Sequence, residues 1–350
     1  MKETNDPSPY HLFSKWGESD SIYPKGFLGN PEVPHPTNTK FYRSWKPFLY
    51  SSGFYDFILG KESYYEFQRK LSSLAEEKFG VSLALSCMVE VNVAGGILKA
   101  SKFHEPGSHF LWNAFLEQDP ILILAAGVSE PGFDGKLKKL QSSVKDDKLT
   151  GIKSFITNGG EADFIFWVTK IEENYPVYFV SNPKAFDHPN IREKKIFHTD
   201  FTPQVSHLRI ELNEFPVAPE NLLVHNYGEL GMELRLKELC SLVSLLIGKT
   251  KSLSVLHEGI YLERKLLVDW QKQFLENFKG NPTKELLLEG VPFPISPLIQ
   301  EVTNHFGLKS PEDLKSIDPD WQLFLWEDHL TKYLLQKKKR NTPNELNRKS

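Results

Sequence analysis

One segment, residues 126–163, constrains the fold of this 350-residue chain more than any other. It begins with a short Glu-Pro-Gly loop and continues as a strand, a tight charged turn at residues 146–148, and a second strand that ends in Ile-Thr-Asn-Gly-Gly. Pro, Gly and Asp mark places where a chain reverses its direction. The segment therefore predicts a hairpin with a structured loop on either side.

The hydrophobic period changes twice along the chain. Residues 48–100 repeat apolar side chains every three or four positions, which predicts helices, and the strongly apolar residues 81–100 predict a helix buried on all sides. From residue 120 the period is two, and from residue 226 it is again helical. The expected strands are residues 121–128, 139–144, 149–157, 164–170, 177–181, 193–198 and 208–215, and the expected further helices are residues 109–116, 226–248, 253–279, 296–306 and 319–336.

This order predicts an α+β fold with three parts. Residues 1–119 form an N-terminal arm and helical domain, residues 120–223 a β-domain built as a sandwich or small barrel, and residues 224–336 a shortened C-terminal helical domain before a polar tail at 337–350. The first ~45 residues are rich in Pro, Gly, Ser and Asn, so we expect irregular structure there.

Composition excludes several classes of protein. Hydrophobic residues make up 40% of the chain and the net charge is -3, which fits a globular protein and implies no nucleic-acid partner. The basic run at residues 337–340 is interpreted as part of a solvated tail. The start of the chain lacks the regions of a signal peptide, and the apolar run at residues 120–128 is far shorter than the ~20 residues of a membrane span. We therefore expect a soluble cytoplasmic protein.

Cysteine and histidine positions predict neither a disulfide nor a metal site. Cys87 and Cys240 lie inside apolar helical patterns, so we expect two buried thiols in a reducing compartment. His104 and His109 flank a Pro-Gly pair, but the sequence has no His-Glu-x-x-His and no cysteine pair. The patterns G-x-x-x-x-G-K, G-x-G-x-x-G and G-x-S-x-G are also absent from the sequence.

Motifs in the β-rich part resemble the flavin-contacting region of the acyl-CoA dehydrogenases. In that family a pattern close to T-E-P-G-x-G-S-D is followed by a hairpin and then by G-x-K-x-W-I-T-N. Residues 129–132, Ser-Glu-Pro-Gly, match the first part, and Gly151, Lys153 and residues 156–158 match the second part at the family's spacing. Residues 207–223 resemble the family's closing strand and its V-P-x-E-N-h-L exit.

The resemblance implies a flavoprotein that binds FAD non-covalently. It implies oxidation of the α,β bond of an acyl-CoA thioester, a reaction of fatty acid metabolism, with electrons passed to an electron-transfer flavoprotein, and assembly as a homodimer or homotetramer. Two alternatives stay open. One is a flavin-dependent monooxygenase of the same fold, which needs no carboxylate base, and the other is a degenerate, non-catalytic member that acts as a binding or assembly partner.

The resemblance also implies a flavin slot. It assigns Ser129 a contact with the flavin edge, Phe155 a ring that lies against the flavin where the family usually has Trp, and Thr157 a hydroxyl near the reactive nitrogen. Val128 completes the slot, and Arg264 takes the place of a flavin-contacting Arg of the family. The residues alone also fit a plainer interpretation, in which Ser129 is a turn residue and Phe155 and Thr157 are alternate positions of a half-buried strand.

Departures from the family pattern affect the substrate and the last domain. Asp134, Gly135 and Lys136 stand where the family has Gly-Ser-Asp, so Gly135 takes the position of a serine that contacts the acyl-CoA. Leu267 and Val268 replace the Phe and Gly of the family's R-x-x-F-G. The family's Gln and the glycine-rich turn that follows it are not recognisable in the sequence.

The catalytic base is a further open point, because it must be a carboxylate that reaches the substrate proton. Glu258 is the candidate, since His-Glu-Gly resembles the family's Tyr-Glu-Gly, and the alternative interpretation is a solvated helix residue. The family's other base position falls near Leu242, which carries no carboxylate. Spatial neighbours such as Glu233 or Glu238 are the remaining candidates.

Overall fold

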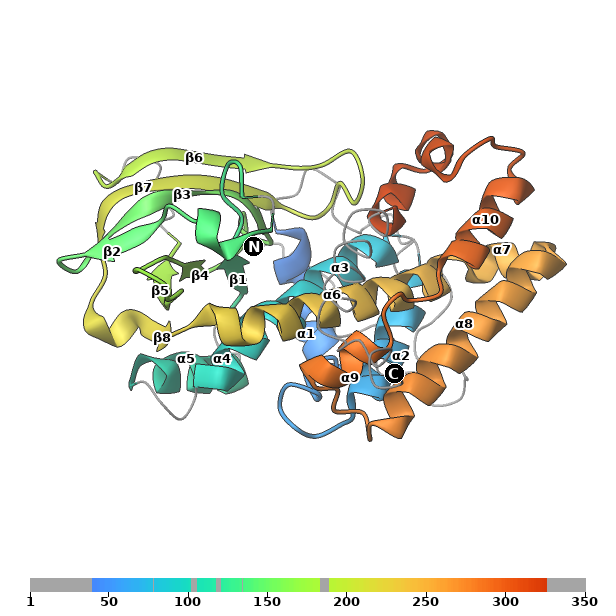
Figure 1. Ribbon diagram of the computed structural model, residues 1–350, viewed down its shortest axis with the longest axis horizontal. Helices are drawn as coiled ribbons and strands as arrows, with labels where there is room; N and C mark the ends of the chain where they lie inside the picture. Colours follow the sequence, from blue (N-terminus) through green and yellow to red (C-terminus); the bar gives the residue numbers. More distant parts are fainter. Residues whose placement is uncertain are drawn as a thin grey trace, which may run out of the picture.

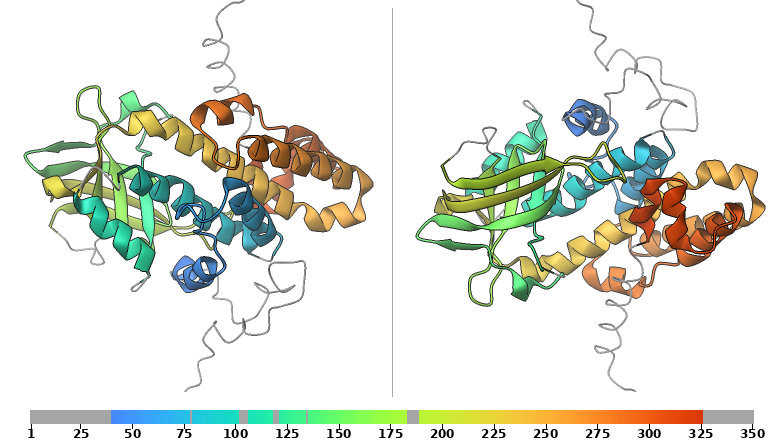
Figure 2. Two further views of the ribbon diagram at one scale, coloured as in Figure 1. Left: turned by 90° about the horizontal axis from the view of Figure 1, so that it is seen from below. Right: turned by 90° about the horizontal axis from the view of Figure 1, so that it is seen from above.

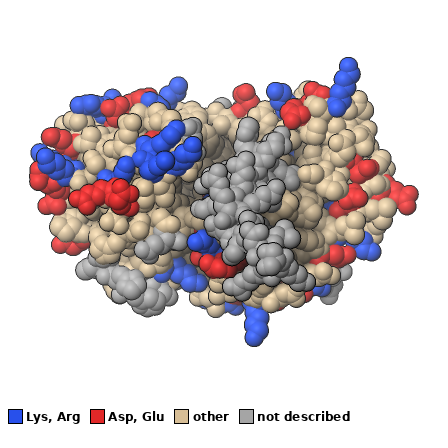
Figure 3. Space-filling view, in the orientation of Figure 1, with Lys and Arg blue, Asp and Glu red and all other residues tan. Residues whose placement is uncertain are grey.

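The computed structural model describes residues 40–77, 79–101, 106–117, 121–133, 135–182 and 189–325. Residues 1–39 of the expected arm, His104, Asp134 and the polar tail with its basic run lie outside the described residues. Helices, strands and again helices follow one another along the chain, which confirms the expected α+β order (Figure 1). Basic and acidic side chains both occur over the sheets and over the helices on the face in Figure 3, in line with the small net charge.

The first helices are α1 (Phe41–Ser51), α2 (Tyr64–Ala75), α3 (Gly80–Val89), α4 (Gly95–Ser101) and α5 (Pro106–Glu117), with the π-helical turn η3 (Glu90–Ala94) between α3 and α4. Helix α1 begins a few residues inside the stretch that was expected to be irregular. Its apolar side chains recur at helical spacing and are buried, among them Phe41, Trp45 and Phe48. This packing outweighs Pro47, which on its own disfavours a helix interior.

The expected buried helix over residues 81–100 is confirmed. Helices α3 and α4 continue into one another through η3, and most of their side chains are buried. In the described part of the chain, Gly80–Ser101 is also the one helix whose length and mean hydropathy of 1.7 would suit a membrane span. However, 89% of its apolar stretch is buried inside the fold, as in the core helix of a globular protein. Cys87 in α3 and Cys240 are free and buried, as expected.

Two four-stranded sheets pack face to face in the β-domain (Figure 1). The first contains, in spatial order, β1 (Leu124–Gly127), β4 (Phe164–Val168), β5 (Val177–Ser181) and β8 (Leu222–Val224), and the second contains β2 (Ser143–Lys145), β3 (Lys148–Thr157), β7 (His207–Pro216) and β6 (Ile191–Phe197). The pair β1 and β4 is parallel and the other neighbours are antiparallel. Both sheets contribute to one core, for example through Ile156 and Ile165, so the domain is a sandwich.

The strand expected over residues 139–144 is wrong for most of its length. The structure has the 3-10 turn η4 (Leu137–Lys139) there, and β2 begins only at Ser143. The reason is Glu130, whose buried carboxylate accepts the backbone N–H of Gln141 at 2.6 Å and of Ser142 at 3.2 Å. These donors bind a side chain instead of a neighbouring strand, so an alternating sequence does not become a strand.

The last helices are α6 (Tyr227–Lys249), α7 (Lys251–Leu256), α8 (Glu258–Asn277), α9 (Lys284–Glu289) and α10 (Ser296–His305), followed by the 3-10 turns η6 (Pro311–Ser316) and η7 (Pro319–Phe324). The helix expected over 253–279 is interrupted at His257, whose backbone is extended and whose ring accepts the N–H of Ile260 to cap α8. Helix α6 runs from the sheets to the opposite end of the molecule, where α7, α8 and α10 lie (Figures 1 and 2).

Gly96 lets α4 and α6 approach closely, because a Cβ at this position would lie 2.6 Å from Leu234 Cδ2. Gly96→Leu is therefore expected to lower the free energy of unfolding by about 1–3 kcal/mol through overpacking. Ala100→Leu, at an exposed position of the same helix, is the matched control and should change it by less than about 0.5 kcal/mol. Urea unfolding measures both, and an unaltered Gly96→Leu protein would contradict this packing.

Candidate functional site

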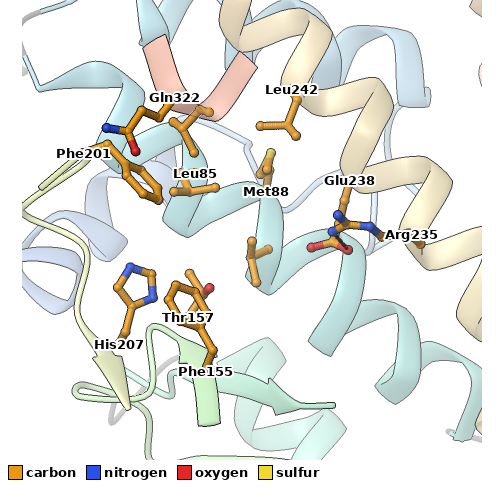
Figure 4. Close-up of a pocket in the computed structure, with 12 residues that line it drawn as sticks. Leu85, Met88, Phe155, Thr157, Phe201, His207, Arg235, Glu238, Leu242 and Gln322 are labelled. Carbon is orange, nitrogen blue, oxygen red and sulfur yellow. Dashed lines mark hydrogen bonds and ion pairs between the residues drawn. The ribbon is translucent and has the colours of Figure 1, made fainter. Parts of the chain in front are cut away.

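A cavity of about 250 Å³ lies where the β-domain meets the helices (Figure 4). Phe155 and Thr157 of β3 line it from the sheet side. Leu85, Met88 and Val89 of α3 and Arg235, Glu238 and Leu242 of α6 line it from the helical side. All three parts of the fold therefore contribute to one site.

Strand β3 places Phe155 and Thr157 together because alternate residues of a strand face the same side. Ile156, between them, is fully buried in the sandwich core, whereas 39% of Phe155 is exposed. The register of β3 against β7 shifts between Lys153 and Ile156, and such an irregularity bends a strand and redirects its side chains. The structure thus brings two of the predicted slot residues into one cavity.

The Glu-Pro-Gly loop and strand β3, which carry the two sequence motifs, are joined by a buried ion pair. The ammonium of Lys153 is buried and donates to the Glu130 carboxylate at 2.7 Å and to the carbonyl of Val168 at 2.6 Å. Burial lowers the pKa of Lys153 to about 8, and the charge of Glu130 opposes that shift. Gly151 is needed for close approach, because a Cβ there would lie 2.1 Å from Ser142 Oγ. Glu130, Gly151 and Lys153, which match the family motifs, therefore shape the loop and the strand that support the slot.

Val128 and Ser129 lie beside the slot and not in the cavity wall. The carbonyl of Ser129 accepts the N–H of Ser154 at 2.9 Å, and the carbonyl of Val128 accepts from Lys153 Nζ at 3.3 Å. Both residues are only partly buried. Their expected contacts with a flavin edge stay predictions.

Glu238 is the carboxylate of the cavity wall. It lies on α6 one helical turn before Leu242, the position to which the resemblance assigned the family's other base. Its Oε2 accepts from Nη1 of Arg235 at 3.1 Å, and Figure 4 shows this pair on the helical side of the cavity. The side chain of Arg235 is 44% exposed and that of Glu238 is 20% exposed.

Turn η7 adds Gln322 and Leu323 to the cavity wall. It is held against the β-domain because Asp320 Oδ1 accepts the N–H of Thr202 at 2.6 Å, and against α6 by an ion pair of 2.5 Å between Lys249 and Asp318. The turn was expected to begin a helix over residues 319–336. Its described part is 3-10 helical, and the side chain of Asp318 caps its start by accepting the N–H of Asp320.

His207 is the buried polar side chain of the cavity wall. It lies at the start of β7 opposite Thr157 and is 1% exposed. Its ring packs against Phe155 with 4.2 Å between centroids and 35° between the ring planes. Neither ring nitrogen has a hydrogen-bond partner among the described residues. Burial lowers the pKa of His207 to about 4, with a smaller contribution from His198, so the imidazole is neutral near pH 7.

This pKa predicts a loss of stability in acid. Between pH ~6.5 and ~4 the unfolded chain binds a proton at His207 and the folded chain does not, so the free energy of unfolding falls as the pH falls through this window. The difference from the ordinary pKa corresponds to on the order of 3 kcal/mol. His207→Phe should remove this part of the pH dependence. Urea unfolding at several pH values compares the two proteins, and equal slopes would contradict the assignment.

The structure does not bring Glu258, Arg264 or Gly135 to this cavity. Glu258 is exposed in the first turn of α8, Arg264 Nε donates to the carbonyl of Ile247 at 2.7 Å, and Gly135 is exposed in the loop before η4 with φ +70°. Helix α8 begins after α7, at the end of the molecule opposite the sheets (Figure 1). Within one chain, Glu238 thus replaces Glu258 as the candidate base.

The site residues of α6 carry a weak signal in the sequence, whereas His207 carries none. Arg235, Glu238 and Leu242 follow one another at spacings of three and four on a Leu-rich helix, which is a signal for one shared face. His207 becomes recognisable only through its register against Thr157. No group of three His, Cys, Asp or Glu side chains that could hold a metal ion occurs in the part of the chain that the structure describes.

No protein-family model and no curated protein matches this chain. Solved structures do match. Butyryl-CoA dehydrogenase from Megasphaera elsdenii is 13% identical, with a TM-score of 0.68 over 93% of this chain and 99% of that one. The prolyl acyl carrier protein oxidase AnaB is 13% identical, with a TM-score of 0.65 over 87% and 91% of the two chains. PigA, solved with FAD and proline, is 13% identical, with a TM-score of 0.60 over 80% and 83%. The chain therefore has an acyl-CoA dehydrogenase-like fold.

Proposed function

Because the chain has the acyl-CoA dehydrogenase-like fold, we propose that it is a FAD-dependent oxidoreductase that oxidises the α,β bond of an acyl thioester. One observation carries the proposal: Phe155 and Thr157 of β3 and Glu238 of α6 line the same cavity (Figure 4). Flavin-dependent dehydrogenation needs a flat slot for the ring and a carboxylate beside the substrate. The aromatic and hydroxyl side chains of β3 and the carboxylate of α6 support this proposal.

The cavity residues fit the ring of a flavin. Leu85, Met88 and Phe155 give it apolar and aromatic walls, and Thr157 adds a hydroxyl. Its volume of about 250 Å³ lies close to the lower end of small-molecule sites, which begin at about 300 Å³. The space therefore suits a ring system, and the rest of a dinucleotide would extend beyond it.

When bound, the flavin would supply the acceptor for the hydride that leaves Cβ of the substrate. Glu238 would accept the proton from Cα, so a double bond forms between Cα and Cβ as one proton and one hydride depart. Arg235 orients the carboxylate through its hydrogen bond to Oε2. The apolar side chains of α3 would give the reacting carbons an apolar wall.

The test is anaerobic reduction of the bound flavin. The protein loaded with FAD is mixed with butyryl-CoA and, separately, with an acyl group on a carrier protein, because similar structures include enzymes named for each kind of thioester. Loss of the oxidised flavin's visible absorbance in either mixture supports the proposal, and the mixture that reacts identifies the carrier.

Other outcomes distinguish the alternatives. A bound flavin that neither thioester bleaches would contradict the dehydrogenase proposal, and oxygen uptake with a reduced nicotinamide would then identify a monooxygenase. A protein that binds thioester and no flavin would fit the non-catalytic alternative. Transfer of electrons to an electron-transfer flavoprotein stays an expectation of the resemblance.

We also propose that the protein associates with a second copy. Large apolar side chains at the junction of α7 and α8 are between 49% and 81% exposed: Val255, Leu256, Tyr261, Leu262 and Leu266. Apolar surface of this kind often marks a contact with another chain. A homodimer or homotetramer, which the resemblance implies, would cover it.

Sedimentation at micromolar concentration is expected to show a dimer or larger species. Replacing Leu262 and Leu266 together by Lys should shift it to the monomer, because two charges would have to lose their hydration in the contact. Ile317→Lys is the control, since Ile317 is 48% exposed on a different part of the surface. A wild-type protein that sediments as a monomer would contradict the association.

A further inference from the structure

The buried side chain of His207 lacks hydrogen bonds within the described part of the protein, as is typical of a side chain that forms its hydrogen bonds with a ligand. Of the residues that line the cavity, it alone has buried side-chain nitrogens with no hydrogen-bond partner among the described residues. Buried polar atoms without a partner are rare, because each forfeits its hydrogen bonds to water. Figure 4 shows the imidazole facing the cavity beside Phe155 and Thr157.

The described ring contacts of His207 are with two phenylalanines, and His198 lies near enough to add to the lowering of its pKa without forming a hydrogen bond to it. The rings of Phe155 and Phe197 lie 4.2 Å and 5.6 Å from the imidazole centroid. These contacts hold the plane of the ring, yet they satisfy neither Nδ1 nor Nε2. The remaining direction is the cavity, so an occupant of the cavity is the natural partner.

The position of His207 in the sheet pairs it with a second hydrogen-bonding group. His207 is the cross-strand partner of Thr157 in the antiparallel pair β3 and β7. Directly opposed residues of such a pair have Cβ atoms about 4.5–5.5 Å apart. The Thr157 hydroxyl and the imidazole are therefore neighbours beside the aromatic surface of Phe155.

We propose that His207, together with Thr157, holds the polar edge of a flat heteroaromatic ring that lies in the cavity, namely the ring of the flavin. This inference rests on the proposed function and adds to it a residue that determines cofactor binding. A neutral imidazole offers one donor and one acceptor, which matches an edge on which carbonyl oxygens and ring nitrogens alternate. The imidazole thus makes the slot selective for such an edge over an apolar ring.

The test uses His207→Phe, which keeps an aromatic ring against Phe155 and removes both nitrogens. Two measurements are expected to move in opposite directions. The flavin-free variant should unfold at a higher urea concentration than the wild type, because two unsatisfied buried polar atoms are gone. Its affinity for FAD, measured by quenching of flavin fluorescence, should fall about 10- to 100-fold.

Two further variants sharpen the result. His207→Gln restores a donor and an acceptor and should recover part of the lost affinity. His198→Phe is the matched control, because His198 also has a buried nitrogen without a partner in the described chain but does not line the cavity. It should leave the affinity for FAD unchanged.

The outcomes separate this inference from the function on which it rests. If the wild type binds FAD and His207→Phe binds it equally well, the inference is overturned and the proposed function stands. If His207→Phe is less stable than the wild type, His207 is a packing residue and the inference is likewise overturned. If the wild type binds no FAD, the proposed function fails and the inference fails with it.

Discussion

Lys46→Met is expected to lower the free energy of unfolding by about 3–5 kcal/mol, because it leaves a buried carboxylate without its counter-charge. Lys46 Nζ lies 2.6 Å from Glu90 Oε1, and the two side chains are 1% and 0% exposed. Glu90, in η3, also accepts the hydroxyls of Tyr42 and Tyr55, each at 2.7 Å, and the N–H of Leu124 at 2.8 Å. The network therefore joins α1, the buried helix formed by α3, η3 and α4, and β1.

Two control proteins test whether the buried charge is the cause. Lys148→Met breaks an exposed pair with Glu214, whose side chains are 53% and 60% exposed, and should cost at most about 1 kcal/mol. The double substitution Lys46→Met with Glu90→Gln removes both charges and should be less destabilised than Lys46→Met alone. Urea unfolding of the four proteins measures the differences. Similar losses of unfolding free energy for Lys46→Met and Lys148→Met would mean that the buried pair adds little to stability.

Glu238→Gln is expected to slow reduction of the bound flavin by an acyl thioester by about 100- to 10,000-fold, the range for loss of a positioned base. An amide keeps the shape of the carboxyl group and can still accept a hydrogen bond from Arg235, but it does not take up the substrate proton. The affinity for FAD should therefore stay close to that of the wild type. Anaerobic stopped-flow absorbance gives the rate.

Glu233→Gln is the matched control for this experiment. Glu233 lies on the same helix, accepts from Lys237 Nζ at 2.6 Å and does not line the cavity. Its loss should leave the rate of reduction unchanged. If an acyl thioester reduces the flavin of the Glu238→Gln variant as fast as that of the Glu233→Gln variant, Glu238 is not the base. The carboxylate would then have to come from outside the described chain.

Local sequence was sufficient to predict the supporting part of the site. Gly151 and Lys153 act within their own hairpin and on the adjoining loop, so their spacing follows from local geometry. The alternation of β3 also predicts that Phe155 and Thr157 share a face. The all-round apolar character of residues 81–100 predicted their burial for the same reason, because one short window contains the whole signal.

The residues that complete the cavity depend on long-range contacts. Glu238 reaches it because the rotation of α6 is set by its packing on α2 and α3, through contacts such as that of Gln68 with Ser241. His207 reaches it because β7 pairs with β3 in one particular register. Neither relation can be read from a single sequence. The neighbours of Glu258 resemble a family motif, and its alternative interpretation as a solvated helix residue agrees with its exposure in the first turn of α8, directly after the break at His257.

The most direct test of whether the cavity between β3 and α6 binds a flavin is a titration of the flavin-free protein with FAD, followed by fluorescence quenching. We expect saturable binding that Phe155→Ala and Thr157→Val each weaken by about 10-fold, through loss of a stacking surface and of a hydrogen bond. Phe110→Ala, at a side chain that is 61% exposed on α5, should bind FAD like the wild type. Absence of binding, or binding that none of these substitutions alters, would show that this cavity is not a flavin site.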